Sequence, residues 1–388
     1  MIDYDKLLSG RIKNTKPSGI RKFFDIAAEM DDVLSLSIGE PDFVTPWHIR
    51  EAGIYSLEQG KTHYTANLGI KELRKEISKY LKRRFSLNFT PQQTIVTVGG
   101  SEAIDLAIRA VINPGDEVLI PEPSFVCYQP ITVMAGGVPV PIVTREKDQF
   151  RLKADHLKAA ITERTKLLVL PYPNNPTGAI MEKDDLRAVA KVIKDKDILV
   201  LSDEIYAELT YGRKHVSIAS IDGMAERTVV VNGFSKAYSM TGWRLGFAAG
   251  PQPIIDAMAR IHQYAIMSAP TTSQYAAVEA LKNGDDDIAA MRDEYDNRRI
   301  MILDGVHSLG LDCFEPFGAF YIFPYIGGFG LSSDEFCKRL LYEHRLAVVP
   351  GDAFGQSGEG FIRISYAYSP DDITQALSRL GDFIRGLK

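Results

Sequence analysis

The sequence predicts an α/β protein: a large domain with a mainly parallel sheet covered by helices, followed by a smaller α+β domain. Three observations support this fold class. Short apolar runs rich in β-branched residues alternate with longer amphipathic stretches between about residues 70 and 250. The apolar runs are almost pure Val, Ile and Leu, which is typical of strands buried on both faces. After about residue 285 the alternation stops and the order of elements changes.

The strands of the large sheet are predicted from the apolar runs, and the helices from the stretches between them. Residues 183–194 place their apolar side chains on one helical face, and Gly69–Phe85 reads as a charged helix with one apolar side. Because such helices cover both faces of a parallel sheet, the strands between them are expected to be fully buried. The runs are Thr94–Val98, Glu117–Ile120, Leu167–Leu170, Ile198–Ser202, Thr228–Asn232 and Leu245–Ala249.

The length of 388 residues suits one large and one small domain. We expect residues 1–45 to form an N-terminal arm and part of the small domain, residues 46–285 the large domain, and residues 286–388 the small C-terminal domain. The run of three aspartates at residues 285–287 is expected to be a solvated loop or a helix start. The predicted elements after it are the helices Ile288–Ser308 and Ser333–Glu343 and the strands Ala319–Pro324, Leu346–Val349 and Phe361–Ala367.

Composition and charge exclude several classes of protein. A net charge of −5 argues against a protein that binds nucleic acid by neutralising phosphates. No run of 18 apolar residues occurs, and Met1–Asp5 carry no basic-then-apolar signal pattern, so neither a membrane span nor secretion is expected. The 3 cysteines form no C-x-x-C pair and no zinc pattern with histidine. We therefore expect reduced cysteines, a cytoplasmic location and no metal.

Polar side chains follow three successive predicted strands. Asn175 comes after the first of them, Asp203 and Tyr206 after the second, and Lys236 and Arg244 after the third. Taken singly, each has an ordinary structural explanation, such as a turn former, a helix cap or a solvated side chain. Ligands in open α/β sheets bind beyond the carboxyl ends of the strands, so their joint occurrence there predicts a functional site. A further arginine, Arg363, lies within a later strand-like run.

The sequence resembles the class I and II aminotransferases, which are pyridoxal-phosphate enzymes of fold type I. Matching segments extend from Ser37–Phe43 to Phe361–Ser365, and the segment Ser235–Arg244 (Ser-Lys-x-Tyr-x-Met-Thr-Gly-Trp-Arg) is the most specific of them. The motifs Asn-Pro-Thr-Gly from Asn175 and Ser-Asp-Glu-Ile-Tyr from Ser202 strengthen the match. The resemblance implies a seven-stranded sheet, the cofactor pyridoxal 5′-phosphate, and an aminotransferase activity.

The resemblance also implies roles around the cofactor ring. Lys236 would carry the cofactor as a Schiff base and, once released by the substrate, act as the general base and acid. Asp203 would keep the pyridine nitrogen protonated, so that the ring can accept electrons. Asn175 and Tyr206 would donate hydrogen bonds to the phenolic oxygen, and Phe125 would stack on the ring unless it is a plain core residue.

At the phosphate end of the cofactor, the resemblance implies a helix start and a cation. Gly100, Ser101 and Glu102 lie where a predicted strand turns into a helix, whose amide groups can meet a phosphate. Arg244 would add paired guanidinium hydrogen bonds. Tyr64 matches a tyrosine contributed by the neighbouring subunit, so a homodimer with a shared active site is implied. Where many relatives have a phosphate-binding serine, three residues before the lysine, this chain has Gly233; Ser235 is the candidate replacement.

The substrates implied are an L-amino acid and a 2-oxo acid, with 2-oxoglutarate as the expected acceptor. Arg363 would hold the α-carboxylate, next to Asn175 and the backbone of Gly39, and Ile20 is a candidate wall for the side chain. Ser101 stands where aspartate-specific bacterial relatives often have a lysine. The absence of a lysine there weakens an aspartate assignment without excluding it, and the sequence as a whole resembles prokaryotic aromatic and N-acetyl-diaminopimelate aminotransferases. This resemblance implies an aromatic amino donor, with N-acetyl-LL-diaminopimelate or aspartate as alternatives.

Two other classes of function occur on the same fold. A pyridoxal-phosphate-dependent C–S β-lyase uses the same scaffold and would release pyruvate and ammonia instead of forming glutamate. A non-catalytic regulator built on this fold usually carries an N-terminal DNA-binding region, and only about 35 residues precede Ser37. The sequence therefore favours an enzyme.

Overall fold

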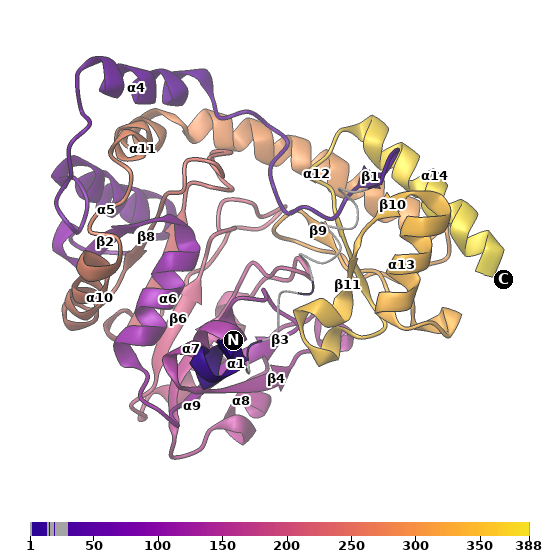
Figure 1. Cartoon of the computed structure of the whole chain (residues 1–388), viewed down its shortest axis with the longest axis horizontal. Helices are drawn as coiled ribbons and strands as arrows, with labels where there is room; N and C mark the ends of the chain where they lie inside the picture. Colours follow the sequence, from indigo (N-terminus) through magenta and orange to yellow (C-terminus); the bar gives the residue numbers. More distant parts are fainter. Residues whose placement is uncertain (1, 14, 16–18, 20–29, 388) are drawn as a thin grey trace.

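The computed structural model describes residues 2–13, 15, 19 and 30–387 of the chain (Figure 1). Ile20, predicted as part of the substrate pocket, lies outside these described residues.

The large sheet has seven strands, in the order β2-β8-β7-β6-β5-β3-β4. Only β8 runs antiparallel to its neighbours, β2 and β7, while the remaining pairs are parallel. The prediction of a mainly parallel seven-stranded sheet is therefore confirmed. The strands are β2 (Thr94–Thr97), β3 (Glu117–Glu122), β4 (Val138–Val143), β5 (Thr165–Leu170), β6 (Leu199–Asp203), β7 (Thr228–Gly233) and β8 (Gly246–Ala249).

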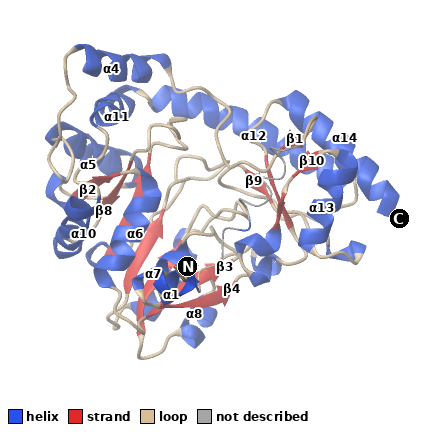
Figure 2. Ribbon diagram, in the orientation of Figure 1, coloured by secondary structure: helices blue, strands red, loops and turns tan. Residues whose placement is uncertain are grey.

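Helices surround this sheet, and several more lie in the second half of the chain (Figure 2). They are α1 (Tyr4–Leu7), α2 (Gly10–Lys13), α4 (Trp47–Glu58), α5 (Lys71–Phe85), α6 (Gly99–Val111), α7 (Tyr128–Ala135), α8 (Ala154–Ala160), α9 (Lys183–Ile193), α10 (Gln252–Ala265), α11 (Thr271–Asn283), α12 (Asp285–Ser308), α13 (Ser333–His344) and α14 (Pro370–Leu387).

The strands in the middle of the sheet are covered on both faces, as their apolar composition predicted. In β5, Leu167 and Val169 pack in one core cluster with the apolar side of α6. The alternate residues Leu168 and Leu170 pack in a separate cluster with the apolar side of α9. Successive side chains of a strand point to opposite faces, so an almost continuous apolar run is what a strand between two helical layers requires.

The strand β4 was absent from the strands predicted from apolar runs. Its sequence, Val-Pro-Val-Pro-Ile-Val, contains Pro139 and Pro141, which interrupt a strand pattern because proline donates no ladder hydrogen bond. The strand lies at the edge of the sheet and pairs only with β3, so the missing donors can face away from the sheet. Four of the other predicted strands agree with the observed strands to within one residue at each end, and β3 and β5 each extend two residues further.

A second, smaller set of strands lies beyond the large sheet, beside α13 and α14 (Figure 1). Three strands form an antiparallel sheet in the order β11-β12-β9. Separately, β1 (Leu34–Ser35) pairs in parallel with β10 (Leu346–Ala347), so the N-terminal segment joins the C-terminal part of the chain. The single strand expected over Leu346–Val349 is thus divided between two sheets. The other strands are β9 (Tyr321–Ile322), β11 (Val349–Pro350) and β12 (Ile362–Ser365).

The three consecutive aspartates form the first turn of α12, which decides between the loop and the helix start that the sequence left open. Negative side chains are favoured there because the first turn of a helix carries a partial positive charge. Among the described residues, no helix is both long enough and apolar enough to cross a membrane.

Candidate active site

A cavity of about 360 Å³ opens at the carboxyl ends of β5, β6 and β7. Because these three strands are parallel neighbours, the residues that follow them reach the same edge of the sheet. The cavity also receives residues from the segment after β1 and from β12, which are far away in the sequence. Of the residues predicted to form the site, those that line the cavity are Gly39, Gly100, Ser101, Phe125, Asn175, Asp203, Tyr206, Ser235, Lys236, Arg244 and Arg363.

Lys236 lines the cavity together with Arg244 and Arg363, and its side chain is partly buried. Its Nζ donates a hydrogen bond to the backbone oxygen of Gly39, at 2.6 Å. Burial lowers the pKa of the Lys236 amine to about 8, against an opposing effect of Glu40 and with a further decrease from the charges of Arg363 and Arg244. A neutral amine, which is the nucleophilic form of lysine, is therefore accessible near neutral pH.

Asp203 is a buried carboxylate at the last position of β6. Its Oδ2 accepts a hydrogen bond of 2.7 Å from the Tyr128 hydroxyl, and its Oδ1 accepts one of 3.2 Å from the backbone amide of Ile205. Burial raises the pKa of Asp203, whereas these two hydrogen bonds lower it. Among the described residues no basic side chain forms an ion pair with it, so a cationic group in the cavity would stabilise the carboxylate.

Arg363 is buried in β12 and presents its guanidinium to the cavity. One terminal nitrogen donates to Oδ1 of Asn175 at 2.9 Å, and the other to the backbone oxygen of Ser37 at 2.5 Å. The guanidinium carbon also lies 4.5 Å from the ring centre of Tyr321. Its Nε is buried and makes no hydrogen bond within the described structure. This arrangement suits a carboxylate, which accepts parallel hydrogen bonds from arginine.

The other end of the cavity is built around the first turn of α6. Gly99 has a φ of +78°, a conformation that favours glycine. A side chain there would also be obstructed, because an added Cβ would lie 2.8 Å from a terminal nitrogen of Arg244. Gly100 and Ser101 follow in the lining of the cavity, so backbone amides at the positive end of the helix and a guanidinium face the same space. This is a donor set for a phosphate group.

Two predicted site residues, Glu102 and Tyr64, do not line the cavity. Glu102 points away from it: one carboxylate oxygen accepts from the Val98 amide, and the other lies 2.8 Å from Nδ1 of His262. The side chain of Tyr64 is 81% exposed. A third predicted residue, Ile20, lies outside the described residues.

The structure adds residues that the sequence motifs did not identify. Tyr321, in β9, lies with its hydroxyl 2.7 Å from that of Tyr206, so these two phenols form one hydrogen-bonded pair in the cavity wall. Nothing in the apolar run around it distinguished Tyr321 from a core residue. Tyr128, three residues after Phe125, is the first residue of α7 and lines the same cavity, so its closeness in sequence to Phe125 was the signal that could have identified it.

The chemistry of this cavity fits pyridoxal 5′-phosphate. The cavity combines a lysine of lowered pKa, a buried carboxylate without a cationic partner in the described structure, and a set of phosphate donors, with the ring of Phe125 in the wall. In the described part of the chain, no group of three or more His, Cys, Asp or Glu side chains is arranged to hold a metal ion.

The chain belongs to the family of class I and II aminotransferases, whose family model matches residues 31–380. It is therefore a pyridoxal-phosphate-dependent aminotransferase of fold type I, and the class of enzyme and the cofactor predicted from the sequence are confirmed.

Individual relatives are similar over nearly their full length. YugH of Bacillus subtilis, whose name gives an aminotransferase without a substrate, is 53% identical, with 97% of this chain and 98% of the relative covered. The aspartate aminotransferase of Pyrococcus abyssi is 46% identical (98% and 99% covered), and the aromatic-amino-acid aminotransferase 2 of Thermococcus litoralis is 43% identical (98% and 99% covered). A solved structure of the aspartate aminotransferase from Thermus thermophilus with maleate superimposes with a TM-score of 0.93 at 39% identity, covering 97% of this chain and 99% of that chain.

Proposed function

We propose that this aminotransferase uses an aromatic L-amino acid as the preferred donor and 2-oxoglutarate as the acceptor. The observation that carries the donor preference is the charge of the cavity. Its described lining contains three cationic side chains, Lys236, Arg244 and Arg363. All three have proposed roles with the cofactor or the α-carboxylate, so none of them is left to pair with a carboxylate on the substrate side chain. The remaining wall is rich in apolar groups, among them Ile38, Ile104, Phe125, Ile205 and Tyr321. An aromatic side chain would bury more apolar surface there than a short carboxylate would.

Aspartate is the second candidate donor. The relative from Pyrococcus abyssi, 46% identical, is named as an aspartate aminotransferase, and the relative from Thermococcus litoralis, 43% identical, as an aromatic one. The two identities are too close to separate the substrates. N-acetyl-LL-diaminopimelate stands beside aspartate as an alternative substrate, and the C–S lyase reaction ranks below both.

In the proposed mechanism, Arg363 binds the substrate α-carboxylate and thereby fixes the orientation of the bonds at the α-carbon. The Lys236 amine would hold the cofactor between turnovers. Once the substrate has replaced it, the amine would take the proton from the substrate α-carbon and donate it to C4′ of the cofactor. Pyridoxal 5′-phosphate, when bound, supplies the electron sink that makes the α-proton acidic. Asp203 would keep the ring nitrogen of the bound cofactor protonated, and the hydrogen bond from the Tyr128 hydroxyl stabilises the negative charge of Asp203.

Other residues would position the cofactor. Asn175 and Tyr206 would donate to its phenolic oxygen, and Phe125 would lie against its ring. Gly100, Ser101, Ser235 and Arg244 would hold the phosphate. Each of these groups faces the same cavity, which supports the assignment.

We also propose a homodimer in which Tyr64 reaches the phosphate of the neighbouring subunit. The exposed aromatic side chain, 81% accessible, supports this role. The division into an N-terminal arm (1–45), a large domain (46–285) and a small domain (286–388) is proposed on the positions of the separate sheets. The free cysteines suit a reducing compartment, so we propose a cytoplasmic location.

The donor is tested by a half-reaction screen. Each common amino acid is mixed with the cofactor-loaded enzyme without acceptor, and loss of the visible cofactor band is followed. Aromatic amino acids should convert the band fastest, and added 2-oxoglutarate should restore it with formation of glutamate. Faster conversion by aspartate would reject the aromatic preference, and release of pyruvate and ammonia would indicate the lyase. In Lys236→Ala the band should be absent; an unchanged spectrum would reject the assignment of Lys236.

A further inference from the structure

A second cavity, distinct from the active site, lies between the end of α5, the loop that follows β6, and the middle of α12. Its volume is about 550 Å³. It shares no lining residue with the active-site cavity. The two are nevertheless adjacent, because Ile205 and Tyr206 line the active site and the next two residues, Ala207 and Glu208, line this groove. We call it the α5–α12 groove.

Basic side chains dominate the lining of the α5–α12 groove. The chain as a whole has a net charge of −5, yet this groove gathers five arginine and lysine side chains and three carboxylates. The basic residues are Arg83, Arg84, Arg213, Lys214 and Arg292, and His215 lies beside them. A concave surface lined by one sign of charge concentrates the electric field and attracts ions of the opposite sign.

Two of the three carboxylates of the groove, Glu208 and Asp296, are engaged by other groups, and the third, Asp293, pairs with Arg292. Glu208 is buried and accepts from the Tyr80 hydroxyl at 2.8 Å and from two nitrogens of Arg84, at 2.9 and 2.5 Å. Asp296 accepts from Arg299, at 2.7 Å. Their negative charges therefore neutralise Arg84 and Arg299 rather than the rest of the groove.

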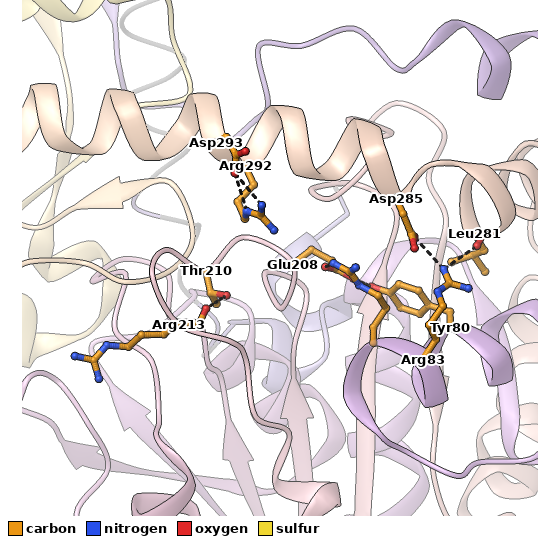
Figure 3. Close-up of polar contacts among 10 residues, drawn as sticks. Tyr80, Arg83, Glu208, Thr210, Arg213, Leu281, Asp285, Arg292 and Asp293 are labelled. Atoms are coloured by element: carbon orange, nitrogen blue, oxygen red, sulfur yellow. Dashed lines mark hydrogen bonds and ion pairs between the residues drawn. The ribbon is translucent and has the colours of Figure 1, made fainter.

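Among the described residues, no buried carboxylate pairs with either of two cations of the groove, Lys214 and Arg292. Within the described residues, no carboxylate lies at ion-pair distance from Lys214. Arg292 has one carboxylate partner, its chain neighbour Asp293, which is 71% exposed and can reach water instead. In Figure 3 the Arg292 side chain extends from α12 toward the side on which Glu208 and Thr210 lie. The Arg213 side chain points away from Arg292. Nε and Nη2 of Arg292 donate to Asp293, at 3.1 and 2.8 Å, so Nη1 is the nitrogen that stays available to the groove.

We propose that the α5–α12 groove is a binding site for a small polyanion, carrying phosphate or carboxylate groups. Arg292 supplies the contact from α12 and Lys214 the contact from the loop after β6, with Arg83 at the rim. Arg83 is held there by Asp285, at 2.9 Å, and by the backbone oxygen of Leu281, at 3.2 Å. Guanidinium groups bind the oxygens of such anions through paired, charge-assisted hydrogen bonds. Because the groove lies outside the active site, the anion does not compete with the amino acid.

Binding is measured by calorimetry on the cofactor-loaded enzyme at constant ionic strength, which keeps the screening of charges equal. Pyrophosphate is the phosphate probe and propane-1,2,3-tricarboxylate the carboxylate probe. At least one should bind with one site per chain, and which of them binds tells the two anion types apart. In Arg292→Gln/Lys214→Gln the dissociation constant should rise by about tenfold or more, the loss of roughly 1.4 kcal/mol. The visible cofactor band and its conversion by amino acid should stay unchanged.

The control variant is Arg187→Gln/Lys191→Gln on α9, which removes the same charge from an exposed helical surface. It should bind the probes as the original chain does. Equal weakening in both double variants would reduce the effect to overall charge and overturn the proposal. So would absence of binding by both probes at millimolar concentration, or binding that disappears in Arg363→Ala but persists in the groove variant, because the probe would then occupy the active site.

Discussion

The hydroxyl of Tyr128 donates a hydrogen bond of 2.7 Å to Oδ2 of Asp203, and both side chains are buried. Burial alone disfavours the charged form of this carboxyl and raises its pKa, whereas the hydrogen bond from Tyr128 lowers the pKa again. Tyr128 is thus a positioning residue for the carboxylate that is proposed to hold the cofactor ring.

Removing this hydroxyl should make the enzyme more sensitive to acid. In Tyr128→Phe the pKa of Asp203 should rise, so the carboxylate is protonated earlier as the pH falls. Hydrogen bonds to charged groups contribute about 1.5–3 kcal/mol, so kcat on the acidic side should fall by about tenfold or more. The measurement is kcat as a function of pH, with the acidic limb displaced to higher pH in the variant.

The matched control is Tyr172→Phe, which deletes another buried phenolic hydroxyl. The Tyr172 hydroxyl donates to the backbone oxygen of Phe150 at 2.8 Å, and Tyr172 does not line the cavity. It should lose stability without displacement of the acidic limb. An identical pH profile for Tyr128→Phe and the original enzyme would show that Tyr128 does not act on Asp203.

Gly99→Ala should weaken cofactor binding. The new methyl group would meet Arg244 at 2.8 Å in a backbone conformation, φ +78°, that costs a non-glycine residue about 1–2 kcal/mol. Displacement of Arg244 should raise the dissociation constant of pyridoxal phosphate by about tenfold or more. Gly115→Ala is the control, since Gly115 has a φ of +91° and no atom within 4 Å of an added Cβ. Equal cofactor affinity in the two variants would contradict the proposed contact.

The lowered pKa of Lys236 should appear in the attachment of the cofactor. Only the neutral amine reacts, and a pKa of about 8 gives far more of it near neutrality than the ordinary value of about 10.4. The rate of reconstitution of cofactor-free enzyme should therefore rise with pH and level off above about 8. Because Glu40 raises this pKa, Glu40→Gln should move the midpoint to lower pH. A rate that keeps rising to the ordinary lysine value would contradict the effect of burial.

Arg363→Ala should raise KM for every amino acid tested, because the α-carboxylate is common to all of them. Loss of charge-assisted hydrogen bonds of this type costs about 1.5–3 kcal/mol, so an increase of about tenfold or more is expected. The measurement compares KM for tyrosine, aspartate and alanine. An increase confined to one substrate would instead mean that Arg363 recognises the side chain.

The large sheet could be predicted because its strands follow a local rule. Apolar runs such as Leu167–Leu170 are needed wherever a strand is buried between two helical layers, and the pattern is visible in the residues themselves. The edge strand β4 was not predicted, because a strand that pairs on one side only tolerates prolines such as Pro139 and Pro141, which interrupt the strand pattern. Likewise, Leu346–Val349 read as one strand, since a change of partner sheet between Ala347 and Val349 leaves no trace in an apolar run.

The cavity residues at the strand ends were accessible to sequence reasoning because their order along the chain matches the order of parallel strands. Asn175, Asp203 and Lys236 follow adjacent strands and therefore meet. Tyr321 could not be inferred in this way, because it comes from the separate small sheet and reaches Tyr206 only through the packing of the two sheets. The groove cations Lys214 and Arg292 are 78 residues apart in the sequence and belong to no motif. Long-range packing of the same kind brings them into one groove.

The stability of the enzyme should depend on pH through His48, which joins three helices. Its Nδ1 lies 2.8 Å from Glu279 of α11, and its Nε2 lies 2.9 Å from Asp287 of α12. Partial burial opposes the charged ring, but the hydrogen bonds to Asp287 and Glu279 raise the pKa of His48 above its usual value. A neutral imidazole has one N–H, so both bonds to carboxylates require the protonated ring.

Because the pKa of His48 is higher in the folded state, protonation of the ring stabilises the folded protein. This stabilisation is complete below the pKa of the unfolded state, near 6.5, and is lost as the pH rises through the pKa of the folded state. His48→Gln should therefore lower Tm more at about pH 6 than at about pH 9. Scans of the cofactor-loaded enzyme at both pH values measure this difference. The control is His156→Gln on the exposed side of α8, which should change Tm little at either pH. A His48→Gln deficit that is independent of pH would mean that the ring contributes packing and not charge.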